Sequence, residues 1–524
     1  MIGSFDADYV IVGAGSSGSV VAEVLSRSGQ YKVLVIEAGY SPQFNPWTRI
    51  PLGFGKTYAD QSVNWCFETE LDPGLSRSDF WPRGRVWGGS STINGLVWIR
   101  PFPDDIDAWR ESCGFGWTEL RPHFDAIENR QAVVGRDGPI AVENPEPFFD
   151  QSDRRLHNAF FEAATNLGLT RRNNFDHDLD DPVCACVGYY HTNTRSGLRV
   201  GCAEAFLRPA NKRENVKILS GFNAHVLRLE AGEARAVCDG QGNEIRARKE
   251  IILCAGSIGS PVILLNSKLK AQLPHLGENL TDHLGINYSF QSKIPTTNDK
   301  LNSFPRRVWS GLQYAWSRRG PIGLGINPAG GFVCSRSSGL QPNIQLYLQS
   351  LTTTNGFQKH QTGERPLLEP DPFSGFSLGL SSCRPKSRGN ISVNAQGKPQ
   401  IQPNSFSHPE DMSEFMDGVK FLRKLAAQPA MRSVIGSEIA PGPSVQSDEE
   451  LEADIRARSG TVYHPVGTCR MGLDQSDAVV DSQGRVFGVA KLRIIDASIF
   501  RSQISVNTNA TTIALAHKIA AEIV

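Results

Sequence analysis

Cysteine is scarce in this chain, with 10 residues among 524. Secreted domains that depend on disulfides carry a far higher density, and the only closely spaced pair here is Cys184 and Cys186. Because no Cys or His partners accompany this pair at ligand spacing, we expect two ordinary thiols and no metal site. The scarcity of cysteine favours a reducing compartment, and we expect a cytoplasmic protein.

The chain also lacks net charge, because 54 basic side chains are balanced by 54 acidic ones. No long-range field therefore attracts polyanions, and nucleic acid is a poor candidate partner. Long hydrophobic runs are absent as well, since no window approaches the roughly 18 uninterrupted apolar residues of a membrane span. The first residues lack the basic start of a signal peptide, and we expect no membrane partner.

An apolar core is nevertheless available, because 40% of the residues are hydrophobic. At ~150 residues per domain, the length predicts about three to four domain-sized units. The 50 glycines and 31 prolines somewhat exceed average usage and indicate many tight backbone approaches rather than low complexity. These features favour an enzyme.

The first forty residues contain the most informative local pattern. An apolar β-branched run at residues 9–12 leads into a glycine-rich turn at 13–18. Apolar residues at helical spacing follow as far as Gly29, and residues 32–37 form a second apolar run. This order predicts a strand, a helix and a second strand.

The glycine turn predicts a dinucleotide site. Its glycines let the backbone approach a pyrophosphate at a helix N-terminus, where unpaired amides point outward. Glu37 is placed to accept hydrogen bonds from an adenosine ribose, and an acid there argues against the 2′-phosphate of NADP. FAD and NAD share this pattern, so both stay open at this point. The candidate cofactor-binding residues of the turn are Gly13, Ala14, Gly15, Ser16, Ser17 and Gly18.

Several later segments have clear periodicity. The strand-like runs are 216–219, 225–229, 250–254, 343–348 and 492–496, and the helical patterns include 120–130, 151–167, 203–207, 411–427 and 511 to the end. The first three runs predict a meander that returns to the nucleotide-binding sheet. The run at 343–348 lies in a region that predicts a second, sheet-based domain.

A second glycine-rich stretch, Gly84-Arg85-Val86-Trp87-Gly88-Gly89-Ser90-Ser91-Thr92-Ile93-Asn94-Gly95, resembles the first signature of the glucose-methanol-choline (GMC) oxidoreductases. In that family the signature packs against a flavin. Residues 254–261 resemble the second signature, and further matches fall at 384–389, 463–472, 492–498 and 506–509. The resemblance spans nearly the whole chain and implies FAD as the cofactor.

The resemblance also implies which residues hold FAD. Some members bind the flavin covalently through a histidine, but Ile93 stands at that position, so we expect non-covalent FAD. Val226 is open to a second interpretation as an ordinary strand residue of the core. The implied contacts are Arg85, Gly89, Ser90, Asn94, Gly95, Val97, Val226, Asp496, Ala497 and Thr508.

Alcohol oxidation removes a hydroxyl proton and moves a hydride from the carbinol carbon to flavin N5, so a base with a pKa near 7 is expected. His464 lies in a loop between Gly- and Pro-containing segments, and the resemblance implies that it is this base. Its implied catalytic partner is Asn507, with Asn509 as the local competitor. An amide can hold the substrate oxygen but cannot take its proton. The other histidines, including His283, are expected to serve structure or surface.

The resemblance implies an α/β fold with a Rossmann-like FAD-binding domain and a second, antiparallel-sheet substrate-binding domain. We expect the FAD-binding domain to comprise residues 1–155, 196–285 and 458–524, and the substrate-binding domain 156–195 and 286–457. The stretch between Pro261 and Leu280 is shorter than is usual in the family, and its role is left open.

The expected activity is FAD-dependent oxidation of a primary alcohol to an aldehyde, with aryl or heteroaryl alcohols favoured. Electrons would pass to O2 or another acceptor. Choline and sugars are alternative substrates within the family, and a non-redox, FAD-containing lyase of the hydroxynitrile lyase type is the alternative outside it. Neither the particular alcohol, nor the natural acceptor, nor the oligomeric state follows from the sequence.

Overall fold

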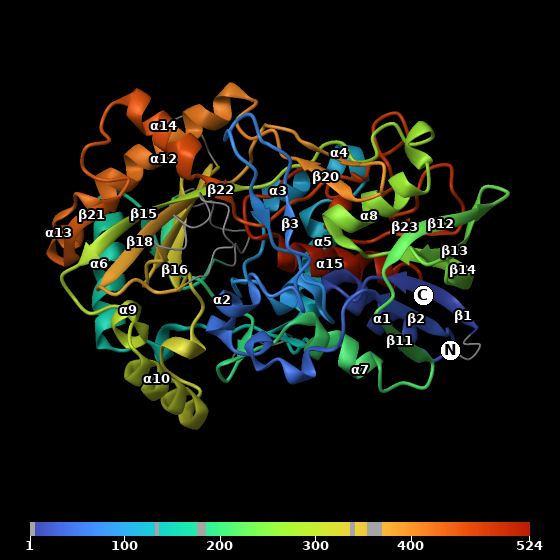
Figure 1. Cartoon of the computed structure of the whole chain (residues 1–524), viewed down its shortest axis with the longest axis horizontal. Helices are drawn as coiled ribbons and strands as arrows, with labels where there is room; N and C mark the ends of the chain where they lie inside the picture. The colour runs from blue at the N-terminus through green and yellow to red at the C-terminus, as the bar shows by residue number, and fades with distance from the viewer. Residues whose placement is uncertain (1–5, 131–135, 176–184, 336–340, 354–368) are drawn as a thin grey trace.

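The computed structural model describes residues 6–130, 136–175, 185–335, 341–353 and 369–524. Two large β-sheets lie toward opposite ends of the long axis (Figure 1). One contains the predicted glycine-turn unit and the other contains the strand predicted at 343–348. The predicted mixed α/β fold is confirmed.

The first sheet is the nucleotide-binding sheet. Its order is β11 (Val216–Ser220), β2 (Val33–Glu37), β1 (Ala7–Val12), β14 (Glu244–Leu253), β13 (Glu233–Asp239) and β12 (Ala224–Glu230), and β23 (Leu492–Ile494) also pairs with β14. The pairs from β11 to β14 and on to β23 are parallel, whereas β12, β13 and β14 form an antiparallel meander. All residues of β1 and β2 are buried, as their continuous apolar runs require.

One helix covers this sheet and a second helix packs on the first. Helix α1 (Ser16–Ser26) follows the glycine turn, and Gly29 beyond it adopts a φ of +73°, which suits glycine at a helix end. Helix α15 (Thr508–Ala521) packs against α1 and against α5 (Trp117–Ile127). Small alanine side chains let α15 lie buried on nearly all its faces. The predicted helix at the end of the chain is thereby confirmed.

The second sheet is mainly antiparallel. Its order is β21 (Ile435–Ala440), β15 (Leu284–Ser292), β18 (Gly375–Ser382), β17 (Ile344–Gln349), β16 (Ala329–Val333), β8 (Cys186–Tyr189) and β7 (Thr170–Arg172), with β22 (Gly460–Thr461) paired to β15. Helices α6 (Gln151–Asn166) and α12 (Pro409–Ala426), both predicted, pack against it. Their apolar faces and this sheet form the second hydrophobic core.

The remaining elements are short or peripheral. The other α-helices are α2 (Phe54–Thr57), α3 (Pro103–Asp107), α4 (Arg110–Cys113), α7 (Arg208–Ala210), α8 (Gly256–Asn266), α9 (Thr297–Leu301), α10 (Phe304–Ser317), α13 (Pro429–Val434) and α14 (Asp448–Arg458). Paired short strands are β3 (Phe67–Glu68) with β4 (Phe80–Trp81), β5 (Glu128–Asn129) with β6 (Ile140–Ala141), β9 (Thr194–Arg195) with β10 (Leu198–Arg199), and β19 (Asn390–Val393) with β20 (Pro399–Gln402).

Three details refine the sequence interpretation. The helix expected at 203–207 is a π-helical turn that continues into α7. The shortened segment after Pro261 is occupied by the end of α8 and a 3-10 turn at Leu269–Ala271. Cys186 is a buried cysteine in β8, whereas Cys184 lies outside the described residues.

The domain boundaries stay a prediction, and β22, from the predicted FAD-binding part, pairs with β15 of the second sheet. Within the described residues, no helix is both long and apolar enough to cross a membrane.

Candidate active site

The glycine turn and the signature loop meet backbone to backbone. The amide of Gly88 donates to the carbonyl of Ala14 over 2.7 Å. A Cβ on Gly89 would lie 2.7 Å from the Cα of Gly15, and a Cβ on Gly18 would lie 1.9 Å from the carbonyl oxygen of Gly13. These two glycines therefore close the turn. Gly15 differs, because its Cβ would meet no atom nearer than 3.9 Å and so would not clash with the protein.

Two helix N-termini converge beside this turn. Helix α1 has Gly15 at its N-cap and α15 has Asn507, and neither helix has a side-chain cap. The hydroxyl of Ser16 donates to Oδ1 of Asn509 over 2.8 Å and joins the two first turns. Uncapped amides and the aligned helix dipoles favour negative charge at this place. The donor set fits the pyrophosphate of a dinucleotide.

Glu37 lies at the end of β2 and fastens the turn from below. Its two carboxylate oxygens accept hydrogen bonds from the amides of Ala14 and Gly39, each over 2.8 Å. Burial raises the pKa of Glu37, while these amides and the charge of Arg85 act in the opposite direction. The Nε of Arg85 is buried and has no hydrogen-bond partner among the described residues. Such an unsatisfied donor beside the turn supports a polar ligand here.

Other implied cofactor residues line the signature loop. Ser90 accepts the Gly84 amide over 3.1 Å through its hydroxyl. The buried guanidinium of Arg199 donates to both the carbonyl and the side-chain oxygen of Asn94, and burial lowers the pKa of Arg199 to about 9. Val97 forms an isolated bridge with Thr192. The loop is therefore held in one conformation by the protein itself.

The remaining implied positions lie on separate elements. Asp496 follows β23, and its carboxylate accepts from the Gly256 amide over 2.9 Å and from the Ser260 hydroxyl over 2.6 Å. It thus ties the second signature to the last strand, and Ala497 accepts the Gly467 amide over 3.2 Å. Further positions are Gly95 after Asn94, Val226 half-buried in β12 and Thr508 at the first position of α15.

The loop that carries His464 is fixed on both sides. The His464 amide donates to Oδ1 of Asp282 over 2.7 Å, and its carbonyl accepts from Nε2 of Gln503 over 3.0 Å. Tyr463 adopts a φ of +72°, uncommon for a residue with a side chain, and its hydroxyl lies 2.7 Å from that of Tyr58. These contacts hold the backbone in a conformation that the chain alone would rarely adopt.

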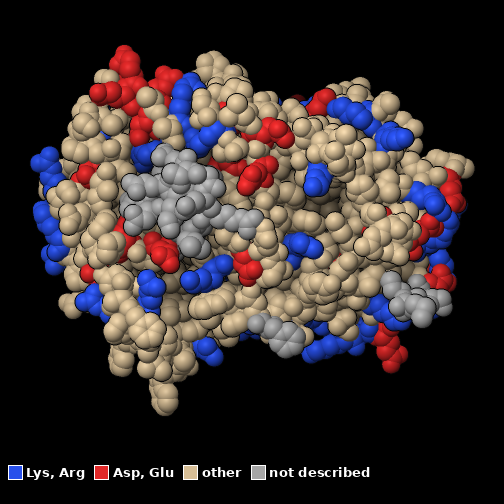
Figure 2. Space-filling model, viewed as in Figure 1, with Lys and Arg blue, Asp and Glu red and all other residues tan. Residues whose placement is uncertain are grey.

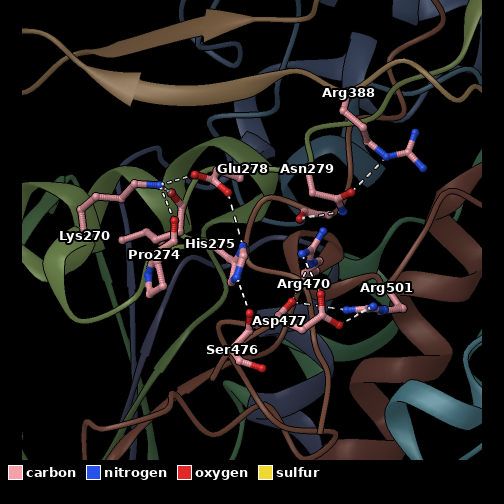
Figure 3. Close-up of polar contacts among 12 residues, drawn as sticks. Lys270, Pro274, His275, Glu278, Asn279, Arg388, Arg470, Ser476, Asp477 and Arg501 are labelled. Atoms are coloured by element: carbon pink, nitrogen blue, oxygen red, sulfur yellow. Dashed lines mark hydrogen bonds and ion pairs between the residues drawn. The ribbon is translucent and has the colours of Figure 1, made fainter. Parts of the chain in front are cut away.

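The segment that follows His464 is also fastened. Figure 3 shows Asn279 between Arg388, whose Nε donates to Asn279 Oδ1 over 3.0 Å, and the next loop. Asn279 Nδ2 donates in turn to the carbonyl of Gly467 over 3.3 Å. Arg470 and Arg501 both pair with Asp477. The short segment after Pro261, residues 384–389 and the His464 loop are therefore joined in one hydrogen-bond network.

The hydrogen-bond pattern assigns the tautomers of two adjacent histidines. His283 Nε2 lies 2.9 Å from the carbonyl oxygen of Cys383 and 2.8 Å from that of Ile504, so this nitrogen must carry a proton. Burial lowers the pKa of His283 to about 4, so the ring is neutral and its Nδ1 is an acceptor. His464 Nδ1, 3.1 Å away, is therefore the donor of this pair. The lone pair of His464 consequently lies on Nε2.

Asn507 faces that lone pair. Its Nδ2 lies 3.1 Å from His464 Nε2. Its Oδ1 accepts from Nε2 of Gln345 over 3.3 Å, and Gln345 in turn accepts the hydroxyl of Tyr347 over 2.8 Å. This chain of bonds turns the NH2 group of Asn507 toward the histidine. Asn509 instead bonds Ser16, so the geometry pairs Asn507 and not Asn509 with the base.

The electrostatics correct one expectation. Burial lowers the pKa of His464 well below its ordinary value, and the nearby His283 and Arg83 lower it further, so a base that titrates near 7 is wrong for this site. The physical reason is burial of the imidazole ring, which among the described residues Asp282 does not offset because it accepts the backbone amide instead. Burial raises the pKa of Asp282 itself to about 7.

Gln345 and Tyr347 were missed from the sequence, and His283 was expected only to serve structure or surface. His283 directly follows Asp282, and this Asp-His pair was a signal, but nothing in the sequence links it to a histidine 181 positions later. Gln345 and Tyr347 alternate on β17 like ordinary strand residues. Only the paired sheet shows that they stand behind Asn507.

Comparison with known proteins identifies the family. The GMC oxidoreductase description matches residues 7–285 and again residues 385–516. The chain belongs to the GMC oxidoreductases, FAD flavoenzymes that act on the CH–OH group of alcohols.

Similar proteins extend over nearly the whole chain. An alcohol dehydrogenase [acceptor] of Pseudomonas putida is 34% identical and covers 99% of this chain and 95% of its own length. Human mitochondrial choline dehydrogenase is also 34% identical, over 98% of this chain and 89% of its own. The crystal structure of pyridoxine 4-oxidase from Mesorbium loti matches with a TM-score of 0.84 at 28% identity, covering 99% of each chain.

Proposed function

We propose that this enzyme oxidises a primary alcohol to the aldehyde and that His464 is the base. The observation that carries the proposal is the unprotonated Nε2 of His464, which is fixed through Nδ1 by His283 and faces the NH2 group of Asn507. A hydroxyl that contacts both groups, and so replaces their direct hydrogen bond, can give its proton to Nε2 while its oxygen accepts from Asn507. Both side chains keep part of their surface accessible, as substrate contact requires.

When bound, FAD supplies the hydride acceptor at flavin N5. The glycine turn, Glu37, Arg85 and the two uncapped helix N-termini would hold its pyrophosphate and ribose, and the signature loop would hold the flavin. We propose that the cofactor is not linked covalently. Ile93 has no nucleophile and packs with Val63 and Val86.

In this proposal His464 keeps the proton at Nε2 as the alcohol is oxidised. The resulting imidazolium still donates from Nδ1 to His283, so the ring keeps its orientation through the step. Because the pKa of His464 is low, the proton is readily released after each turnover. Electrons then pass to O2 or another acceptor.

We further propose an aryl or heteroaryl alcohol as the substrate class. Support comes from the aromatic pair Tyr58 and Tyr463 next to His464, whose ring centroids are 5.8 Å apart, and from the likeness to pyridoxine 4-oxidase. Choline is the second candidate, because choline dehydrogenases are among the relatives at 33–34% identity.

An anaerobic alcohol panel tests both the class and the chemistry. We expect benzylic and pyridine-type primary alcohols to bleach the flavin faster than choline or a sugar, each at matched concentration. Faster bleaching by choline would replace the first candidate with the second. If no alcohol bleaches the flavin, the redox proposal fails, and a non-redox activity of the hydroxynitrile lyase type becomes the function to test. Repeating turnover with O2 and with a dye then identifies the acceptor class.

A further inference from the structure

Helix α10 carries its apolar face toward solvent. On a helical period, Phe304, Val308 and Leu312 form one ridge, and Trp309 and Trp316 flank it. Their exposed fractions are 78%, 43%, 60%, 69% and 94% respectively. A surface helix of a globular protein ordinarily does the opposite and buries such a stripe. The stripe is therefore not part of either core.

Polar side chains fasten the opposite face of this helix to the protein. Ser310 and Tyr314 are its buried residues. The Ser310 hydroxyl donates to the carbonyl of Lys300 over 3.0 Å, and the Tyr314 hydroxyl donates to the carbonyl of Gly197 over 2.7 Å. The helix thus keeps its outward orientation through specific hydrogen bonds, not through burial of its apolar side.

The apolar ridge is concentrated and projects from the molecule. Of the ten large hydrophobic side chains that are exposed in the described part of the chain, five lie on α10, while the others are scattered. Figure 1 shows α10 projecting at the lower left, and Figure 2 shows a largely uncharged projection there. Concentrated exposed apolar surface of this kind marks an interaction site.

Positive charge borders the ridge at both ends. Arg306 and Arg307 lie in its first turn, and Arg318 and Arg319 directly follow its last residue. All four are exposed, and the hydrogen bonds of Arg306 and Arg307 to described residues go to uncharged oxygens. No ion pair with a described residue neutralises any of them. Four positively charged side chains therefore border the ridge although the whole chain is neutral.

We propose that α10 docks the enzyme onto an anionic lipid bilayer. Tryptophan and arginine beside an apolar ridge are the residues that bind the headgroup zone, where the apolar side enters the lipid and the cations meet phosphates. A convex helix about 21 Å long reaches a flat bilayer without steric conflict. This docking needs no spanning helix.

A second copy of the chain fits this surface less well. Two ridges packed face to face would bring the arginines of one copy against those of the other. A single projecting helix is also narrow compared with the roughly 800 Å² per partner that a stable protein interface buries. Charge complementarity therefore favours lipid phosphates over self-association.

Vesicle sedimentation with the holoenzyme tests the proposal. We expect wild type to bind vesicles of phosphatidylcholine mixed with phosphatidylglycerol at least tenfold more tightly than phosphatidylcholine alone, and added salt to weaken the binding. Leu312→Glu should reduce binding tenfold or more. Leu473→Glu is the matched control, because Leu473 is similarly exposed, at 70%, but lies away from α10. Replacing both Arg318 and Arg319 with glutamine should weaken the preference for anionic vesicles, because two of the four cations are lost.

Activity with a water-soluble alcohol and dye should stay within twofold of wild type in all these variants, which shows that they fold. Wild type that fails to sediment with anionic vesicles overturns the proposal. So does equal loss of binding in Leu312→Glu and Leu473→Glu. Sedimentation velocity on the same samples tests the alternative that a second copy covers the ridge. A wild-type dimer that becomes a monomer in Leu312→Glu, with no vesicle binding, would assign the ridge to a second copy.

Discussion

The cofactor side and the reaction side of this active site are built differently. On the cofactor side, the site is formed mainly by backbone amides, glycines and Glu37, and most of these groups lie within the first forty residues. On the reaction side, four side chains from separate segments form one hydrogen-bond chain: His283, His464, Asn507 and Gln345. Removing one side chain should therefore affect FAD affinity on the cofactor side and the reaction rate on the reaction side, and this contrast can be measured.

The largest expected effect is on the reaction side. His464→Ala should lower the rate of flavin reduction by a substrate alcohol about 10²- to 10⁴-fold, because it removes the proposed base. Anaerobic stopped-flow measurement of flavin bleaching isolates this step from the acceptor. FAD content should stay near wild type. A variant that reduces its flavin within a few-fold of wild type would show that another group takes the proton.

Glu37→Ala is the matching test on the cofactor side. We expect FAD affinity to fall about ten- to hundredfold, because a charged acceptor of two hydrogen bonds is lost from beneath the glycine turn. Flavin reduction in the residual holoenzyme should change only a few-fold. Equilibrium titration of the apoprotein with FAD measures the affinity, with the exposed Glu111→Ala as the control. Unchanged affinity would remove Glu37 from the site.

His283 tests whether the tautomer of the base matters. His283→Leu should lower the rate of flavin reduction about tenfold, since His464 Nδ1 loses its acceptor and the lone pair is no longer confined to Nε2. His283→Asn places an oxygen near the position of Nδ1 and should restore much of the rate. Both variants lose the Nε2 donor, so any shared loss of stability cancels. Equal rates in the two variants would mean that His283 is merely structural.

Asn507→Ala should have a smaller effect, about fivefold on the same rate, because one neutral hydrogen bond is worth about 1 kcal/mol. Asn509→Ala should leave flavin reduction within twofold, since that side chain bonds Ser16 rather than the base. The two variants are compared by stopped flow with one alcohol. If Asn509→Ala proves the more damaging for reduction, the assignment of the partner must be reversed.

The smallest effect concerns pH. Since the pKa of His464 is well below its ordinary value, we expect no loss of the base form between pH 8 and 6. Asp282, with a pKa of about 7, should give a modest inflection there of less than about threefold. The rate should rise with pH, because the ionised carboxylate accepts the His464 amide more strongly and favours positive charge on the ring. Asp282→Asn should remove the inflection. If the rate in this variant still changes tenfold near pH 7, the titrating group is His464.

The contrast also explains what could be predicted from the sequence. The first strand, helix and strand were predicted because their signals are local: apolar runs, a glycine turn and Gly29 at the helix end. His464 and Asn507 were identified through resemblance to the GMC family, not through periodicity. The contact of His283 with the base could not be predicted, because it depends on two carbonyls and an imidazole from three other segments. Helix α10 was missed for a further reason: which side of an apolar stripe faces solvent is set by tertiary contacts.

The pairing order of the nucleotide-binding sheet bears on the synthesis of the protein. Strand β1 pairs along one side with β14 near residue 251, and β14 pairs with β23 near residue 492. Strand β1 is synthesised early, but its sheet is complete only after almost the whole chain, including β23, has been synthesised. At about 5–20 residues per second this delay is on the order of a minute. During that time the apolar strands β1 and β2 have no finished sheet to join, so this sheet is completed only late in synthesis.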